Sequence, residues 1–151
     1  MHACIASGAA FLFCVLWFDL MFDVQTRNHP GDALPTEVLA SISGYYWRVT
    51  IEAWPMNRLI AVVMILTVLA IVTEIVRIVD NWWIGWVSLT AAVTAIGLAR
   101  LRTIPNAARL GRAKGSIESQ TALARAIYRD HIYCLTAMIV VLALQLSASR
   151  F

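Results

Sequence analysis

Charged side chains are scarce in this chain: Asp, Glu, Lys and Arg make up 14% of its 151 residues, against about a quarter in an ordinary soluble domain. Hydrophobic residues make up 60%. A water-soluble protein of this composition would expose large apolar patches, which are typical of surfaces that face a membrane. The shortage of charge therefore excludes an ordinary soluble domain and indicates a protein that lies in a lipid bilayer.

Signature motifs of well-known enzyme classes are also missing. The sequence has no phosphate-binding G-x-x-x-x-G-K-[ST] loop, no G-x-S-x-G or H-E-x-x-H motif and no dinucleotide-binding G-x-G-x-x-G. The three cysteines form no C-x-x-C pair, and an odd number argues against a disulfide framework. The di-iron E-x-x-H signature is absent, and a haem held by two histidines is disfavoured because only His131 lies near the interior of an apolar run. We therefore expect no metal and no cofactor.

The chain contains four long apolar runs with few charged residues. A bilayer core of about 30 Å needs about 20 helical residues, and each run reaches or approaches that length once its flanks are added. We therefore expect one transmembrane domain over residues 1–151, with helices at about 3–23, 55–77, 82–101 and 126–148.

The loop after the first predicted helix contains an amphipathic segment, residues 36 to about 50. Leu39 and Ile42 are followed at helical spacing by Tyr45 and Tyr46. A helix with an apolar face rich in aromatic residues is typical of the membrane interface. The predicted fold class is therefore all-α: an integral membrane four-helix antiparallel bundle with an additional amphipathic interfacial helix in the first cytoplasmic loop.

Lys and Arg are distributed unequally between the loops. Ten of the 12 lie in or beside the two long loops, 25–58 and 100–130, and only Arg77 and Arg150 lie near the other side. Because positive residues favour the cytoplasmic side, we expect a multi-pass protein of the cell membrane (inner or plasma membrane) with both large loops cytoplasmic and both termini outside. This placement accounts for the net charge of +3 without a nucleic-acid partner, since no nucleic-acid-binding motif is present.

Asp19 is the anomaly of the first predicted helix, because it lies about one turn inside the apolar run. An ionised carboxylate at mid-helix costs about 2.5–3.5 kcal/mol on insertion scales unless it is paired or protonated. Asp23 follows four residues later on the same helix face, so the pair suits proton transfer, cation binding or metal ligation. A structural alternative is an ion pair with Arg58, next to Asn57 at the start of the second helix, which would fix the packing of the two helices.

His131 begins the fourth apolar run and is expected at the same level as Asp19 and Asn57. Two carboxylates and one histidine could form a facial metal site, but nothing in their spacing requires one, and a lone histidine is more often a hydrogen-bonded interfacial residue. Asn57 and Asn106 each lie close to a proline at the cytoplasmic boundary, where they either complete helix ends or line a vestibule. At the opposite side, Glu74 and Arg77 are spaced for a surface ion pair.

The entry to the second helix, Pro55-Met56-Asn57, and the exit from the third, Pro105-Asn106, are similar to the anthrone oxygenase-like family of small four-helix membrane proteins. The resemblance is mainly architectural and covers nearly the whole chain. Where the family often shows Trp and Asn-x-x-Arg, this chain has Tyr128-Arg129-Asp130-His131. The resemblance implies the four-helix fold, and for a few fungal relatives it implies cofactor-free oxidation of polyketide anthrones.

Three functions remain open from the sequence. The first is an accessory subunit or a binder of a hydrophobic molecule, with a polar site at the cytoplasmic end of the bundle. The second is a membrane enzyme, such as a cofactor-free oxygenase or an oxidoreductase, in which His131, Asp19 or Asn57 handles a proton of a lipid-soluble substrate. The third is a proton- or cation-coupled carrier that works as an oligomer. The expected partners are membrane lipid, a hydrophobic small molecule, other membrane subunits or further copies of the chain.

Overall fold

The computed structural model describes residues 1–77 and 82–149, apart from the side chain of Trp54. All regular structure in this part of the chain is helical. Four helical segments are long and apolar enough to cross a membrane: His2–Thr26, Pro55–Arg77, Trp82–Gly111 and Ile117–Ala148. The all-α prediction with four candidate spans is therefore confirmed.

The four long helices are α1 (His2–Asp23), α3 (Trp54–Arg77), α4 (Trp82–Leu98) and α6 (Ile117–Ala148). The last of these begins at Ile117 rather than near residue 126. Its early start has a local cause, because the Ser116 side chain accepts a hydrogen bond from the Ser119 backbone N–H and caps the helix. Gly115, with φ of 106°, makes the turn just before it.

The third span does not stop at the end of α4. A wider turn, Ala99–Thr103, carries the chain into α5 (Ile104–Gly111). Pro105 lies in the first turn of α5, directly after the helix changes from the wider turn back to α-helical geometry. The exit from the third predicted helix is therefore a continuation of it, and it brings α5 next to α2.

The amphipathic segment forms α2 (Thr36–Trp47), which a π-helical turn (Arg48–Glu52) connects to α3. Leu39, Ile42 and Tyr46 form its buried face and pack in one cluster with residues of α5 and α6. The packing is close: a Cβ atom on Gly111 of α5 would lie 2.8 Å from the backbone nitrogen of Trp47. The tight contact holds α2 firmly on α5.

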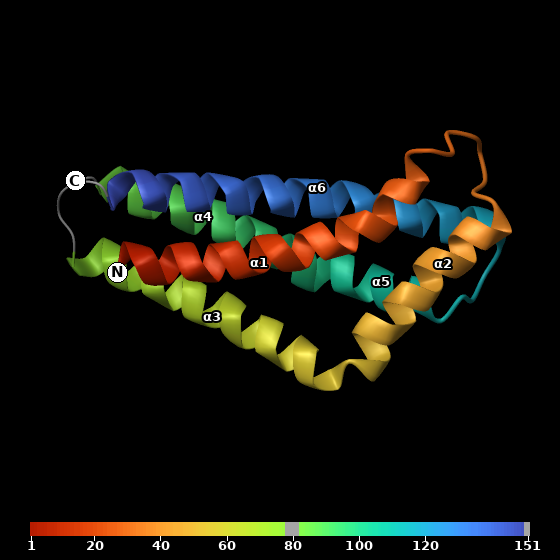
Figure 1. Ribbon diagram of the computed structural model, residues 1–151, viewed down its shortest axis with the longest axis horizontal. Coiled ribbons are helices and arrows are strands. Elements are labelled where there is room, and N and C mark those ends of the chain that lie inside the picture. Colours follow the sequence, from red (N-terminus) through yellow and green to blue (C-terminus); the bar gives the residue numbers. More distant parts are fainter. Residues whose placement is uncertain (78–81, 150–151) are drawn as a thin grey trace.

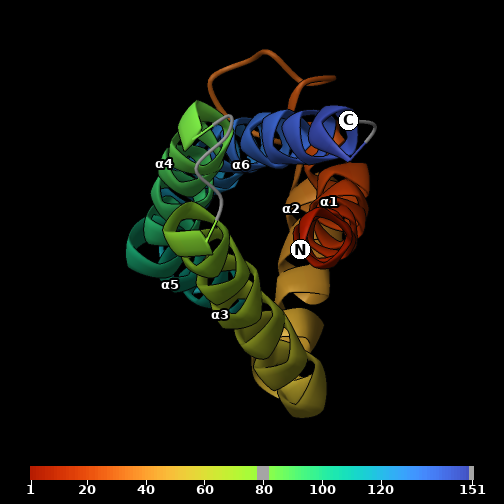
Figure 2. The same cartoon turned by 90° about the vertical axis from the view of Figure 1, so that its left-hand side faces the viewer.

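The long helices run along the long axis of the molecule, with α2 and α5 together at one end and the N-terminus at the other (Figure 1). α6 packs against both α1 and α4, while α3 leaves the group toward its own N-terminal end (Figures 1 and 2). The main core lies among the four long helices and is built from small and aliphatic side chains, including Ile5, Ala9, Ala92 and Val141. Small residues on α4 allow close approach of neighbouring helices.

Candidate functional site

Three buried side chains from three helices meet beside α2. Asp23 ends α1 and is fully buried. Tyr46 of α2 donates its hydroxyl to Asp23 Oδ1 at 2.6 Å, and His131 Nδ1 of α6 donates to Asp23 Oδ2, also at 2.6 Å. Such short bonds to a carboxylate are typical of charge-assisted hydrogen bonds.

Asp19 extends this group by one helical turn toward the middle of α1. The Tyr45 hydroxyl donates to Asp19 Oδ1 at 2.6 Å, and Asp19 Oδ2 lies 3.8 Å from His131 Nε2. The Tyr45 ring stacks on Phe22 with ring centroids 4.0 Å apart, which holds the phenol in place. We call these five residues, Asp19, Asp23, Tyr45, Tyr46 and His131, the polar site.

Helical spacing explains why the site forms where it does. Asp19 and Asp23 are four residues apart on one face of α1. His131 lies on the buried stripe of α6 between Ile127 and Cys134, so it points into the molecule. Tyr46 shares the buried face of α2 with Leu39 and Ile42. Each side chain is therefore directed inward by the same periodicity that buries its apolar neighbours.

The site combines two carboxylates with one imidazole and two phenols. Burial raises the pKa of both Tyr45 and Tyr46 above the ordinary tyrosine value, and the neighbouring carboxylates raise it further. Both phenols therefore stay neutral and act as donors. With Nδ1–H directed at Asp23, the remaining imidazole nitrogen of His131 faces Asp19 at 3.8 Å, which is within ion-pair range and beyond hydrogen-bond distance.

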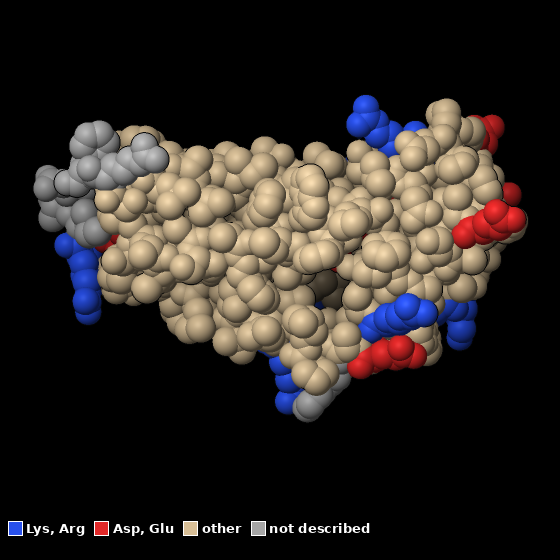
Figure 3. Space-filling view, viewed as in Figure 1, with Lys and Arg blue, Asp and Glu red and all other residues tan. Residues whose placement is uncertain are grey.

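Asp19 and Tyr45 are the partly exposed members of the site, and Asp19 is its exposed carboxylate: 17% of the Asp19 side chain is exposed, whereas that of Asp23 is fully covered. The space-filling view shows the surface hollowed between α3 and the α2 end of the molecule (Figure 3). Met56, Leu59 and Val62 on the half of α3 nearer to α2 are about half exposed. Of the two carboxylates in the polar site, Asp19 is therefore the one that a molecule outside the helices can reach.

The other predicted site residues lie apart from this group. Asn57 and Arg58 are exposed on α3, and the Asn57 amide donates to the Thr50 backbone carbonyl. Asn106 is half-buried on α5. The carboxylates of Asp19 and Asp23 instead take their partners from α2 and α6. The structure thus brings Asp19, Asp23 and His131 together and leaves the three α3 and α5 residues outside.

The phenols of Tyr45 and Tyr46 were not among the predicted site residues, because their aromatic character suggested a place at the membrane interface. Tyr46 is 2% exposed, whereas the adjacent Trp47 is 41% exposed. The spacing of Leu39, Ile42 and Tyr46 is the signal that places Tyr46 on the buried face.

A second buried polar cluster lies at the opposite end of the long helices. Gln145 of α6 donates to Glu74 of α3 at 3.1 Å and to Ser88 of α4 at 3.2 Å. His2 Nδ1 of α1 lies 2.9 Å from Glu74 Oε1. The predicted surface pair of Glu74 with Arg77 is therefore wrong: Glu74 is buried and its partners come from α1 and α6. This cluster connects all four candidate spans, and we interpret its role as structural.

Near the polar site, Asp130 is also buried, and its Oδ2 lies 3.2 Å from Arg102 Nε and accepts from the Thr103 hydroxyl. This pair joins α6 to the turn after α4. In the described part of the chain no buried side-chain nitrogen or oxygen lacks a partner, and no group of three or more His, Cys, Asp or Glu residues is placed to hold a metal ion.

Comparison with known proteins adds no relative: no protein-family model, curated protein or solved structure matches the chain. The function must therefore be argued from the polar site itself.

Proposed function

We propose that the protein binds a hydrophobic molecule and holds the polar group of that molecule at Asp19. The observation that carries this proposal is the gradation of burial within the polar site, from the covered Asp23 to the partly exposed Asp19. A purely structural network gains nothing from a carboxylate that is left partly exposed. A ligand that enters from the lipid would meet this carboxylate first.

The energetic cost of the site supports a functional role. Replacing a buried ion pair by well-packed apolar residues of similar volume often leaves the stability of a protein unchanged or increases it. Here two carboxylates lie in an apolar span and occupy two phenols and an imidazole from two other helices. The second cluster already connects the four spans, so packing alone does not require the polar site.

The membrane arrangement is part of the proposal. We propose that the four long helices form an antiparallel bundle, that α2 lies near the membrane interface, and that the polar site is at its cytoplasmic end. The concentration of Lys and Arg near α2 and α5, visible on the face shown in Figure 3, supports this orientation.

Native mass spectrometry of detergent-purified protein tests the binding role. Wild-type protein should carry a small hydrophobic molecule as a non-covalent adduct, and Asp19→Asn should lose most of it. Asp32→Asn, which changes an exposed carboxylate in the loop before α2, is the matched control and should keep the adduct. An adduct that survives Asp19→Asn unchanged, or no adduct in wild-type protein, contradicts the proposal.

A second candidate function is proton transfer on the bound molecule, which would make the protein an enzyme. The favouring observation is the Asp23–His131–Asp19 arrangement, in which Asp23 orients the imidazole and leaves Nε2 near the exposed edge. An oriented imidazole of this kind is a suitable general base. The resemblance to the anthrone oxygenase-like family fits this candidate, since cofactor-free oxidation of a phenolic substrate begins with removal of a proton.

Turnover of a phenolic substrate separates the two candidates. If the protein is an enzyme, His131→Gln should abolish turnover while a retained adduct shows that binding persists. If the protein only binds, no substrate is consumed by the wild type and His131→Gln changes affinity alone.

A further inference from the structure

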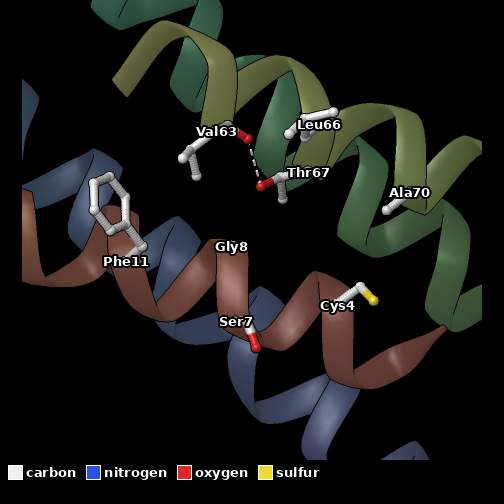
Figure 4. A pocket seen from close by; sticks show the side chains of 8 residues that line it. All are labelled: Cys4, Ser7, Gly8, Phe11, Val63, Leu66, Thr67 and Ala70. Atoms are coloured by element: carbon white, nitrogen blue, oxygen red, sulfur yellow. Dashed lines mark hydrogen bonds between the residues drawn. The ribbon is translucent and has the colours of Figure 1, made fainter. Parts of the chain in front are cut away.

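An apolar groove runs along the contact between α1 and α3, on the outside of the helices. It lies between Cys4–Phe11 of α1 and Val63–Ala70 of α3, with a volume of about 340 Å³ (Figure 4). At Gly8 the two helices are in close contact, because a Cβ atom there would collide with the Thr67 side chain. The Thr67 hydroxyl donates to the Val63 carbonyl, so it offers no free donor to an occupant. We call this the tail groove.

The tail groove and the exposed edge of the polar site share one side of α1. Gly8 and Asp19 are eleven residues apart on α1. Eleven residues complete three helical turns with about 20° of rotation left over, and they rise about 16 Å along the axis. On the facing helix, α3 separates from α1 toward the polar site, with Leu59 and Val62 about half exposed. A molecule with one long axis could therefore contact Asp19 and Gly8 together.

The distance defines the length of such a molecule. Half of a hydrocarbon core of about 30 Å is about 15 Å, which is the depth that one lipid tail occupies. This depth matches the rise from Asp19 to Gly8. A tail of ordinary acyl length whose head is at Asp19 would thus end in the tail groove.

The chemistry of the polar site defines the head. The Tyr45 and Tyr46 hydroxyls already donate to carboxylates. Among the described residues, Asp19 Oδ2 faces only His131 Nε2, at a distance of 3.8 Å. The open position of the site is thus an acceptor, and two carboxylates repel an anionic head.

We propose that Asp19 and the tail groove together bind a single-chain amphiphile with a neutral hydroxyl or phenol head and a tail of acyl length. This assignment rests on the proposed binding function and specifies its ligand class. It distinguishes the ligand from fatty acids and phospholipids, whose heads carry negative charge.

Photo-crosslinking in lipid nanodiscs tests the assignment with two probes that share one tail. One is a long-chain 4-alkylphenol with a diazirine near the tail end, and the other is a fatty acid with the same labelled tail. The phenol probe should label peptides that contain Cys4–Phe11 and Val63–Ala70, and the fatty acid should label them about tenfold less. Asp19→Asn should reduce phenol labelling about tenfold, as expected for the loss of one hydrogen bond to a charged group.

Filling the groove provides a second variant that leaves the polar site intact. Ala70→Phe should reduce labelling of the groove severalfold, while Val76→Phe, at an exposed position of α3 outside the groove, should not. Labelling spread evenly over the four spans, or equal labelling by both probes, overturns the assignment. If the native adduct still depends on Asp19 in that case, the binding function stands and only the ligand class is wrong; if it does not, the binding function fails as well.

Discussion

Replacing Tyr46 with Phe removes one oxygen atom from the polar site and leaves the shape of the side chain unchanged. The lost hydroxyl donates to Asp23 Oδ1 at 2.6 Å, and Asp23 is fully buried, so water has no access to replace it. A hydrogen bond to a charged group contributes about 1.5–3 kcal/mol, and a buried acceptor left without its donor costs a similar amount. We expect Tyr46→Phe to lower the free energy of unfolding by about 2 kcal/mol.

Two further tyrosines serve as matched controls. Tyr45→Phe breaks an equally short bond to Asp19, but the Asp19 carboxylate is partly exposed, and in a micelle a detergent head group or water can replace the hydroxyl, so the cost should be about 0.5–1 kcal/mol. Tyr133→Phe breaks an exposed bond to Thr94 and should change almost nothing. Equilibrium unfolding in mixed micelles, followed by circular dichroism, measures all three. A cost for Tyr46→Phe no larger than that for Tyr45→Phe would refute the reasoning that the covered Asp23 depends on this donor.

Three other predictions follow from the same structure. Because the pKa values of Tyr45 and Tyr46 are raised in the folded protein, their contribution to stability is complete below pH of about 10 and is lost as the pH rises toward the folded-state values. Tyrosinate absorbance of these two residues should therefore appear only when the protein unfolds in alkali. Gly111→Ala should lower the free energy of unfolding by about 1–3 kcal/mol, because the new methyl group meets the backbone of α2. Gly97→Ala places its methyl group with no neighbouring atom within 4 Å and should be neutral or slightly stabilising. Thermal unfolding compares the two variants. In a cysteine-free background, a cysteine at Lys114 should react with an impermeant thiol reagent only from the cytoplasmic side, and a tag at the N-terminus should be accessible only from outside; access to both from one side contradicts the proposed topology.

Features that depend on periodicity were predictable from the sequence. The four apolar runs predicted four spans, and the structure has four helices long and apolar enough to cross a membrane. His131 was predicted to lie at the level of Asp19 and Asn57, because they occupy corresponding ends of their runs. The structure brings His131 within hydrogen-bond or ion-pair distance of Asp23 and Asp19, whereas Asn57 lies apart and donates to the Thr50 carbonyl. Both results follow from the helical repeat and from chain reversal between helices.

Contacts that depend on the angle between helices were not predictable. Arg58 was the expected partner of the carboxylates, but α3 separates from α1 at that level, and α2 occupies the position instead. Glu74 was expected to pair on its own helix with Arg77, but the rotation of α3 directs it inward to His2 and Gln145. A pattern read along one helix indicates which face is apolar, and does not indicate which neighbour meets an isolated polar residue on that face.

The polar site, with His131, and the second cluster, with Gln145, lie near opposite ends of the buried stripe of α6. The side chains between them decide whether a proton or cation can pass from one to the other. His131 and Gln145 are fourteen residues apart, a rise of about 21 Å. Between them the stripe presents Cys134, Met138 and Val141 to the core. A proton- or cation-coupled carrier needs polar groups along its path. Between the clusters the described core has apolar side chains and the Thr67 hydroxyl, which already donates to the Val63 carbonyl of its own helix. Transfer across the membrane therefore lacks a continuous polar path in the described core, while a molecule in the surrounding lipid needs to reach only the partly exposed Asp19. The geometry thus favours a molecule that arrives and leaves within the plane of the membrane.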